Sequence, residues 1–319
     1  MNTNVDKNKR DRLANFLYSY WENNKEKRES SFNYIRKHIK DQIKSIELTS
    51  EDTIVHLQDG RKFYWNPNSY DSLNGFIRIG NWEPESVHIL EKLIKDGDCV
   101  VDVGANFGWY TTLFANYTGS KGTVHSFEPL KHMNNELISN VNLNEYQNVT
   151  INELGLGEAN SLKKFYYPKT RGSMFSSLKK HSKNNDYIEY TCRFITLDSY
   201  VKDNNINCID LIKLDVEGAE LLVLNGAKNL LSSKKAPILT LEVSQSLSSS
   251  FNYTPKYLED FLKQYNYSLF TISKELKLKP VSSLEGLETL NIFCLQKRHI
   301  DYYKDLFEQS KEIKESINS

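Results

Sequence analysis

An acidic residue, two glycines and an asparagine follow an apolar stretch in the segment VVDVGANFGWYTTLF, residues 100–114. The apolar stretch predicts a buried strand, and the glycines permit a sharp turn into a helix with the backbone close to a ligand. Glu128 ends the next apolar stretch, twenty residues after Gly108, where a carboxylate can accept hydrogen bonds from both hydroxyls of a ribose. The residues that could hold a nucleotide here are Asp102, Gly104, Asn106, Gly108 and Glu128.

Two kinds of nucleotide compete for this turn. A nicotinamide dinucleotide fingerprint requires G-x-G-x-x-G, whereas this turn has only Gly104 and Gly108, four positions apart. Asp102 would also point a negative charge towards a pyrophosphate. S-adenosylmethionine has no pyrophosphate, and an acid favours its cationic sulfonium and amino groups. We therefore expect S-adenosylmethionine, and a tight turn with an incidental acid is the remaining alternative.

A second group of charged residues lies in IKLDVEGAE, residues 212–220. Strand alternation places Lys213 and Asp215 on one face, and burying an unpaired lysine in a central strand is costly. Two interpretations stay open. Either the two residues form a buried ion pair that only shapes the site, or Asp215 orients or deprotonates an acceptor while Lys213 tunes it by charge. Glu217 is a further candidate, whereas Glu220 is more typical of a helix N-terminus.

Glu242 ends another apolar stretch and is expected to point into the same crevice. Together with Asp215 or Glu217 it could bind a divalent cation, because hard cations prefer carboxylate ligands. No histidine has supporting spacing, so we predict that no metal is bound. Asp198 in the segment TLDSY is predicted to be a helix N-cap.

The segment KTRGSMFSSLKKH, residues 169–181, is long and polar and has the character of a lid. Its residues Arg171, Ser173, Ser176 and Ser177 could contact an acceptor. A solvated loop would explain the same composition nearly as well.

Apolar stretches alternate with helical patterns from residue 98 onward. Strands are expected at CVVDVG, GTVHSFEP, NVTINEL, CIDLIKLDV, APILTLEV, YSLFTIS and LNIFCLQK. Strands that alternate with helices predict parallel crossover units and therefore a doubly wound α/β sheet. Ligands bind such sheets at the carboxyl ends of the strands, where the candidate residues stand.

The stretches GDCVVDVGANFGWYTTLFA, VHSFEP, ITLDSY and IDLIKLDVEGAELLVLNGA, in this order and spacing, resemble the FkbM-type S-adenosylmethionine-dependent methyltransferases. The resemblance covers about residues 75–245. It implies a seven-stranded, Rossmann-like methyltransferase sheet whose last two strands form an antiparallel hairpin near residues 267–297.

The resemblance also implies roles for individual residues. Asp102, Gly104, Asn106 and Gly108 would surround the methionine part of the cofactor. Glu128 would hold the ribose, and Leu156 would contact the adenine. The family commonly has an alanine where this sequence has Gly155.

Four regions are expected along the chain. Residues 1–45 form a basic helical arm, with eleven Lys and Arg against six acids. Residues 46–82 form a β-hairpin, marked by Asp59-Gly60, and a loop that packs on the core. Residues 83–299 form the methyltransferase domain, and residues 300–319 form a C-terminal helix or tail.

The 319-residue chain has 41 Lys and Arg against 41 Asp and Glu, so its net charge makes no general case for nucleic acid. Its four cysteines form no CxxC pair, which is typical of reduced thiols in a cytoplasmic protein. No apolar run approaches the ~18 residues of a membrane span, and the N-terminus lacks the apolar region of a signal peptide. The N-terminal helices could form a homo-oligomer.

We expect from these features transfer of a methyl group to a hydroxyl of a sugar, a glycan or a secondary metabolite. Three alternatives remain. One is a binding protein that keeps the cofactor fold without turnover. Another is a methyltransferase that acts on nitrogen or on nucleic acid, although no N/D-P-P-Y-type motif is present. The weakest is an NAD-dependent enzyme.

Overall fold

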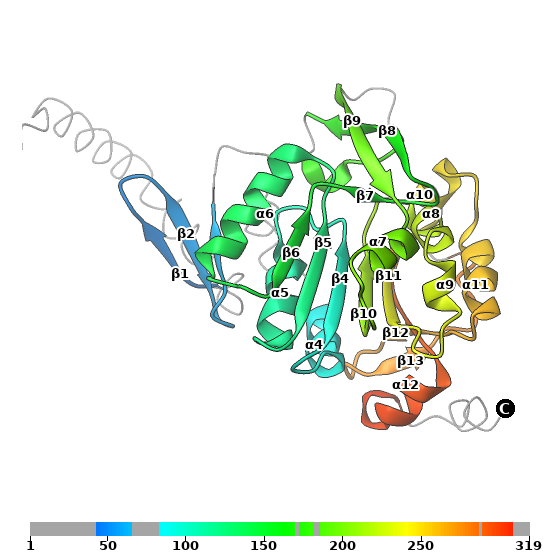
Figure 1. The fold of residues 1–319 in the computed structure, drawn as a ribbon. Helices are drawn as coiled ribbons and strands as arrows, with labels where there is room; N and C mark the ends of the chain where they lie inside the picture. Colours follow the sequence, from blue (N-terminus) through cyan, green and yellow to red (C-terminus); the bar gives the residue numbers. More distant parts are fainter. Residues whose placement is uncertain (1–42, 66–82, 170–171, 181–185, 287–288, 309–319) are drawn as a thin grey trace, which may run out of the picture.

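The computed structural model describes residues 43–65, 83–169, 172–180, 186–286 and 289–308 (Figure 1). The predicted basic helices before residue 43 and the loop 66–82 lie outside these ranges. The first described strand, β1 (Ile43–Leu48), overlaps the end of the predicted arm, and the division of the chain into four regions stays a prediction. None of the helices in these ranges has the length and apolarity needed to cross a bilayer.

An eight-stranded sheet forms the centre of the fold. Its strands, in spatial order, are β13 (Leu278–Pro280), β12 (Ser268–Ile272), β14 (Thr289–Leu295), β11 (Ile238–Ser244), β10 (Leu211–Leu214), β4 (Cys99–Val103), β5 (Thr123–Phe127) and β6 (Val149–Asn152). The strands from β11 to β6 are parallel, and β14 runs antiparallel to both β11 and β12. The doubly wound α/β sheet and its antiparallel last pair are therefore confirmed. The sheet has eight strands instead of the predicted seven, because the short β13 adds to the free edge of β12.

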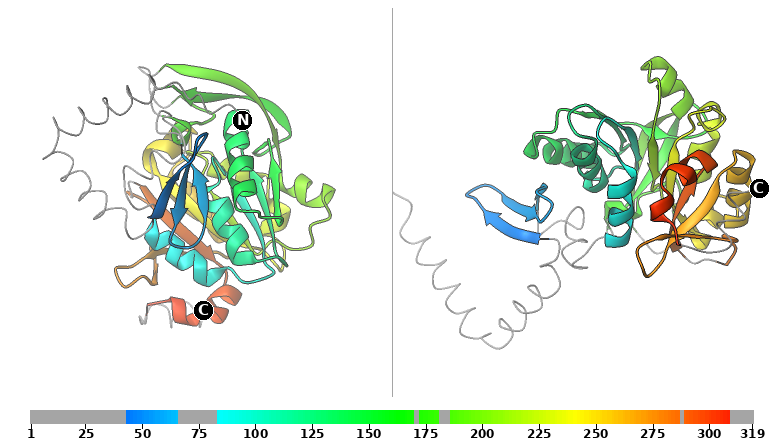
Figure 2. Two further views of the ribbon diagram at one scale, coloured as in Figure 1. Left: turned by 90° about the vertical axis from the view of Figure 1, so that its left-hand side faces the viewer. Right: turned by 90° about the horizontal axis from the view of Figure 1, so that it is seen from below.

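Helices cover both faces of this sheet (Figures 1 and 2). One face carries α4 (Pro84–Leu93), α5 (Trp109–Thr118) and α6 (Lys131–Leu143), and the other carries α7 (Leu197–Asp203), α8 (Glu220–Asn225), α9 (Lys228–Leu231) and α11 (Pro255–Gln264). Side chains alternate along β4, so Val100 packs under the first set of helices and Val101 and Val103 under the second. By the same alternation, Asp102 and its cross-strand neighbour Lys213 lie on the face of α5. Two charged residues thus interrupt an apolar layer.

A smaller sheet of β7 (Gly155–Leu156), β9 (Tyr187–Ile195) and β8 (Ser161–Pro168) lies beyond the carboxyl ends of the parallel strands (Figure 1). The sequence analysis missed its two long strands. Exposed and partly or fully buried positions alternate along parts of both strands, which is a weak strand signal compared with the fully apolar central strands.

A three-stranded sheet of β1, β2 (Thr53–Leu57) and β3 (Lys62–Tyr64) contains the predicted hairpin at Asp59-Gly60. It joins the domain through α6, because Asn140 and Asn144 accept hydrogen bonds from backbone N–H groups of β3. Arg61 is only 1% exposed and donates to the carbonyl of Trp109, over whose ring its guanidinium lies. This sheet therefore stabilises the first residue of α5.

The described chain ends in α12 (Lys297–Tyr302) and a 3-10 turn, η2 (Lys304–Leu306). Helix α12 begins before the predicted residue 300. The side chains of Gln296 and His299 cap each other's backbone N–H groups there, which fixes the start of the helix.

Candidate active site

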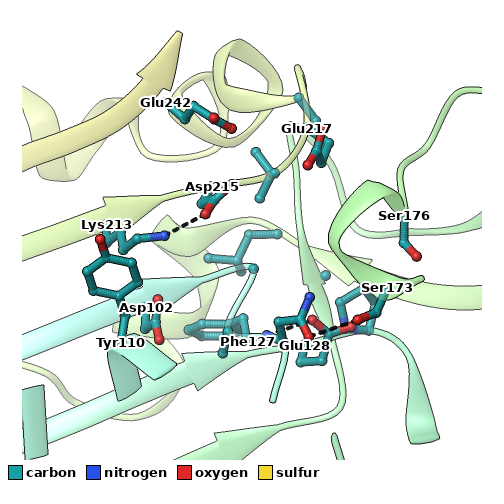
Figure 3. Close-up of a pocket in the computed structure, with 18 of the residues that line it drawn as sticks. Asp102, Tyr110, Phe127, Glu128, Ser173, Ser176, Lys213, Asp215, Glu217 and Glu242 are labelled. Carbon is teal, nitrogen blue, oxygen red and sulfur yellow. Dashed lines mark hydrogen bonds and ion pairs between the residues drawn. The ribbon is translucent and has the colours of Figure 1, made fainter. Parts of the chain in front are cut away.

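A cavity of about 280 Å³ opens at the carboxyl ends of β4 and β10 (Figure 3). The chain continues from β4 to β5 on one side, while β10 lies on the other, so the cavity is at the topological switch point. Nine of the ten residues predicted from the sequence line it: Asp102, Gly104, Asn106, Glu128, Leu156, Lys213, Asp215, Glu217 and Glu242. Gly108 does not line the cavity, and its place beside the cofactor stays a prediction.

The turn after β4 needs glycine for a steric reason. Gly104 has φ +84°, and a Cβ on it would lie 1.9 Å from the carbonyl oxygen of Asp215. The backbone N–H of Gly104 donates to the carbonyl of Phe127, which joins the turn to the end of β5. Gly108 caps α5 at φ +95°, where a Cβ would lie 2.6 Å from Leu137 on α6. Gly104 brings two strand ends together, and Gly108 allows two helices to pack.

The carboxylate of Glu128 links the turn to the end of β5. One oxygen accepts from the backbone N–H of Asn106 at 3.0 Å and the other from that of Leu130 at 2.9 Å. Burial raises the pKa of Glu128 to about 7, against the lowering effect of these two hydrogen bonds. Each oxygen keeps a second lone pair, so the carboxylate can accept further hydrogen bonds from the cavity side.

Asp102 is fully buried beneath the turn. One of its oxygens accepts from the hydroxyl of Thr111 at 2.6 Å, and the other has no hydrogen-bond partner in the described part of the chain. Burial raises the pKa of Asp102, although the charge of Lys213 and the Thr111 hydrogen bond oppose this. An unpaired buried carboxylate oxygen is costly, which suits a site that receives a donor or a cation.

Lys213 and Asp215 form an ion pair with 2.9 Å between Nζ and Oδ2. The Lys213 side chain is 9% exposed, and its Nζ lies 4.3 Å from the centre of the Tyr110 ring. Burial lowers the pKa of Lys213, but the carboxylates of Asp215 and Asp102 outweigh burial and raise it overall. Lys213 is therefore a charged, paired lysine, and the Asp215 side chain is 35% exposed beside it.

Glu217 and Glu242 complete a cluster of carboxylates around Asp215 (Figure 3). One oxygen from each of the three side chains lies within 4.8 Å of the others. The backbone of Glu217 has φ +54°, a left-handed conformation that residues other than glycine rarely adopt and that often marks functional turns. The charge of Asp215, followed by burial, raises the pKa of Glu242 to about 8. Such a cluster could hold a divalent cation, and our expectation that no metal is bound stays a prediction.

Hydrogen bonds connect the predicted lid segment to the turn after β4 and to the turn after β10. Its 3-10 turn η1 (Ser173–Phe175) places the hydroxyl of Ser173 at 3.0 Å from the Asn106 side-chain oxygen, to which it donates. Ser177 donates to the carbonyl of Glu217 at 3.1 Å. Ser173, Ser176 and Ser177 are buried, so a solvated loop is the wrong explanation for them. Arg171 lies outside the described residues.

Two acids close to the site have structural roles. Glu220 accepts from the backbone N–H of Gly218 and from the hydroxyl of Tyr253, in agreement with its expected place at a helix N-terminus. Asp198 is not the N-cap of its own helix, because Thr196 takes that position. Its carboxylate instead accepts from two backbone N–H groups at the start of α9.

Replacing Glu220 by glutamine is expected to stabilise the protein at pH 8. Burial raises the folded-state pKa of Glu220 to about 7 from an ordinary 4.5. The folded protein therefore binds more protons than the unfolded chain, and this group's contribution to stability falls as the pH rises from about 4.5 to about 7. Glutamine has no proton to lose at this pH, so the free energy of unfolding of the variant should exceed that of the wild type by about 1–3 kcal/mol at pH 8.

Urea unfolding at pH 5 and pH 8 measures this difference, with the exposed Glu275→Gln as the control. The gain should shrink below about 1 kcal/mol at pH 5. An equal effect of Glu220→Gln at the two pH values would show that the proton is not bound at Glu220.

Several residues that line the cavity were missed by the sequence analysis. Glu83 precedes α4 and accepts from the hydroxyl of Tyr110, one residue into the helix that follows the turn. The aromatic lining includes Phe165, Phe175 and Phe194, which come from the smaller sheet and η1. Predicting β8 and β9 from their alternation would have found Phe165 and Phe194.

Gly155 stands where the resemblance leads us to expect alanine, and Phe194 explains the difference. A Cβ on Gly155 would lie 2.2 Å from Cε1 of Phe194, whose ring is 3% exposed and lines the cavity. The ring therefore occupies the space of the missing methyl group. Both Phe194 and Leu156, the residue expected to contact adenine, line the cavity.

The variant Gly155→Ala is expected to lose about 1–3 kcal/mol of stability through overpacking and to bind S-adenosylhomocysteine more weakly. Adding Phe194→Leu should restore part of the stability, because it makes room for the methyl group. Gly157→Ala is the matched control, since its Cβ would meet Phe194 at an ordinary 3.7 Å. Chemical unfolding and calorimetry check the three variants, and equal losses in Gly155→Ala and Gly157→Ala would contradict the account.

A family model described as "Methyltransferase FkbM domain" matches residues 102–269, just over half of the chain. The chain belongs to the FkbM methyltransferase family. This match confirms the family expected from the sequence, and with it S-adenosylmethionine as the cofactor.

The chain is also similar to part of a much longer protein. AMB antimetabolite synthetase AmbE of Pseudomonas aeruginosa is 25% identical over 248 residues, which are 66% of this chain and 11% of that protein. The chain thus spans about a ninth of that relative's length.

Solved structures resemble the chain at low sequence identity. One is an S-adenosylmethionine-dependent O-methyltransferase from Thermotoga maritima, with 14% identity, a TM-score of 0.38, and coverage of 79% of this chain and 85% of that one. Another is fibrillarin from Aeropyrum pernix with natively bound S-adenosyl-L-methionine, with 12% identity, a TM-score of 0.37, and coverage of 80% and 99%.

Proposed function

We propose that this protein transfers the methyl group of S-adenosylmethionine to a hydroxyl of a sugar, a glycan or a secondary metabolite. The observation that carries the proposal is the position of Asp215. Its side chain enters the cavity directly after β10, and its backbone carbonyl contacts the glycine turn through which the cofactor would be held.

The residues of the cavity fit this cofactor. The unpaired oxygen of buried Asp102 can receive a donor or a cationic group, and S-adenosylmethionine carries both. Gly104 lets the turn after β4 lie against the backbone of Asp215, and Glu128 can accept hydrogen bonds from ribose hydroxyls. Leu156 and Phe194 offer an apolar surface for adenine. When bound, S-adenosylmethionine supplies an electrophilic methyl group on sulfur.

Asp215 is suited to act on the acceptor. Its carboxylate would accept the proton of the acceptor hydroxyl while that oxygen forms a bond to the methyl carbon and the carbon–sulfur bond breaks. The proton passes from Asp215 to solvent, and S-adenosylhomocysteine leaves. Lys213, held by Asp215 and Tyr110, orients the carboxylate through the 2.9 Å ion pair. The segment that carries the buried residues Ser173, Ser176 and Ser177 would exclude water from the reacting groups.

A methyl-transfer assay with deuteromethyl-labelled S-adenosylmethionine tests the proposal. The acceptor panel contains sugars, polyols, hydroxylated amines and small phenols, and each product is analysed by mass spectrometry and NMR. We expect label in a methyl ether, with equal release of S-adenosylhomocysteine. Label recovered only on nitrogen or carbon would contradict transfer to a hydroxyl.

A further inference from the structure

A row of polar side chains crosses the main sheet beneath α5. Lys213 on β10, Asp102 on β4 and Ser126 on β5 are cross-strand neighbours, and all three are buried. Thr111 of α5 packs against this row and is itself fully buried. Of these four residues, Asp102 and Lys213 line the cavity, whereas Thr111 and Ser126 do not. The two hydroxyls can therefore influence a ligand only through another residue.

The hydroxyls of Thr111 and Ser126 form a chain of hydrogen bonds that ends on Asp102. Thr111 donates to Oδ2 of Asp102 at 2.6 Å, a distance typical of a bond from a hydroxyl to a carboxylate. The oxygens of Thr111 and Ser126 are 3.1 Å apart. Because Thr111 has one hydroxyl hydrogen and gives it to the carboxylate, this second bond needs the hydrogen of Ser126. Both hydroxyl dipoles thus point towards Asp102.

Thr111 differs from two other buried threonines of α5 in its choice of partner. Thr112 and Thr118 each donate to the backbone carbonyl four residues earlier, which is a common bond for a helical threonine. Thr111 instead directs its hydroxyl out of its own helix to a side chain of β4. The branched side chain of threonine has few rotamers, so its hydroxyl is a well-fixed donor.

We propose that Thr111 is a positioning residue for cofactor binding: its hydroxyl, supported by Ser126, holds the carboxylate of Asp102 in the orientation that receives the amino group of S-adenosylmethionine. Oδ2 is occupied by Thr111, and Oδ1 has no hydrogen-bond partner in the described part of the chain. The amino group suits Oδ1 because an ammonium carries N–H donors, whereas the sulfonium has none. This inference rests on the cofactor site of the proposed function and does not depend on the acceptor.

The same hydrogen bond helps to keep Asp102 charged. Burial raises the pKa of Asp102, and the charge of Lys213 and the hydrogen bond from Thr111 oppose that rise. Lys213 already forms the 2.9 Å ion pair with Asp215, so it does not take over the role of a directed donor to Asp102. Without the Thr111 hydroxyl, the carboxylate loses both a fixed orientation and part of the stabilisation of its charge.

The variant Thr111→Val tests the proposal, because valine keeps the shape of threonine and removes the hydroxyl. Two ligands are compared by calorimetry and ligand-observed NMR: S-adenosylhomocysteine, and 5′-methylthioadenosine, which keeps the adenosine and the sulfur but lacks the amino acid end. We expect S-adenosylhomocysteine to bind at least about tenfold more weakly, a difference of about 1.4 kcal/mol, and 5′-methylthioadenosine to stay within about twofold of wild type. Thr111→Ser keeps the hydroxyl and should recover most of the affinity for S-adenosylhomocysteine.

Thr118→Val is the matched control. It also removes a buried hydroxyl of α5, but Thr118 does not line the cavity and bonds to the carbonyl of Phe114. It should lower stability and leave both affinities unchanged. Urea unfolding and circular dichroism measure the folding of every variant. Where Thr111→Val alone is too unstable, the double variant with Ser126→Ala takes its place, because it also removes the hydroxyl that would lose its partner.

Three results would overturn the proposal. Equal weakening of the two ligands in Thr111→Val would show that the substitution damages the turn as a whole, and equal weakening in Thr118→Val would show a general effect of α5. An unchanged affinity for S-adenosylhomocysteine in Thr111→Val, with a loss in Asp102→Ala, would overturn this inference and leave the cofactor site standing. Failure of the wild type to bind S-adenosylhomocysteine would overturn the cofactor site and this inference together.

Discussion

The variant Asp215→Asn is expected to lower kcat for methyl transfer by about 10²–10⁴-fold, the usual contribution of a general base. Asparagine keeps the size of the side chain but cannot take the proton of an acceptor hydroxyl. Lys213 keeps the carboxylate of Asp102 as its cross-strand neighbour, so the fold should tolerate the change. The affinity for S-adenosylhomocysteine should therefore stay within a few-fold of wild type.

Steady-state kinetics with the acceptor found in the labelled assay measure kcat, and calorimetry measures the affinity. Asp203→Asn, at the exposed end of α7, is the matched control and should behave as wild type. An unchanged kcat in Asp215→Asn would assign the ion pair a purely structural role. If the wild type turns over none of the acceptors, a binding protein without turnover is favoured instead.

The variant Gly104→Ala is expected to reduce the free energy of unfolding by more than about 3 kcal/mol or to prevent folding. Two effects add. Alanine disfavours the positive φ of +84°, and its Cβ would lie 1.9 Å from the carbonyl oxygen of Asp215. That oxygen belongs to backbone at the end of β10, so it cannot move without displacing the Asp215 side chain from the cavity.

Gly97→Ala separates the two effects. Gly97 has a similar φ of +95°, but a Cβ there would meet nothing within 4 Å. We expect it to cost only about 1 kcal/mol from the backbone conformation. Urea unfolding of both variants checks this, and equal losses in the two would show that the contact with Asp215 does not matter.

Much of the fold could be predicted because its signals are local. The apolar central strands and the glycines between them have strong patterns, and they correctly placed β4, β5, β10 and β11. The smaller sheet could not be found in this way. Its strands face partly into the cavity and partly into solvent, so their mixture of polar and apolar residues is a weaker signal than the continuous apolar run of a buried strand.

Some residues of the candidate site could likewise be predicted from local sequence signals, and others could not. Asp102 lies near the end of β4 and Asp215 directly follows β10, and the sheet topology alone brings them together. Glu83 and Phe194 reach the cavity from elements whose positions depend on tertiary packing. The reason why glycine replaces the expected alanine at position 155 could not be predicted from the sequence, because the ring that fills the space belongs to Phe194, 39 positions away.

The most direct test of the account is calorimetric titration of the protein with S-adenosylhomocysteine, repeated with Asp102→Ala and Glu128→Ala and with NADH as the control ligand. We predict binding to the wild type, no binding of NADH, and a loss of about 1.5–3 kcal/mol or more in each variant, as expected when a charged hydrogen-bond acceptor is removed. Circular dichroism of both variants confirms that they remain folded. Preferential binding of NADH, or binding of S-adenosylhomocysteine that neither substitution weakens, would contradict the assignment of this turn as the cofactor site.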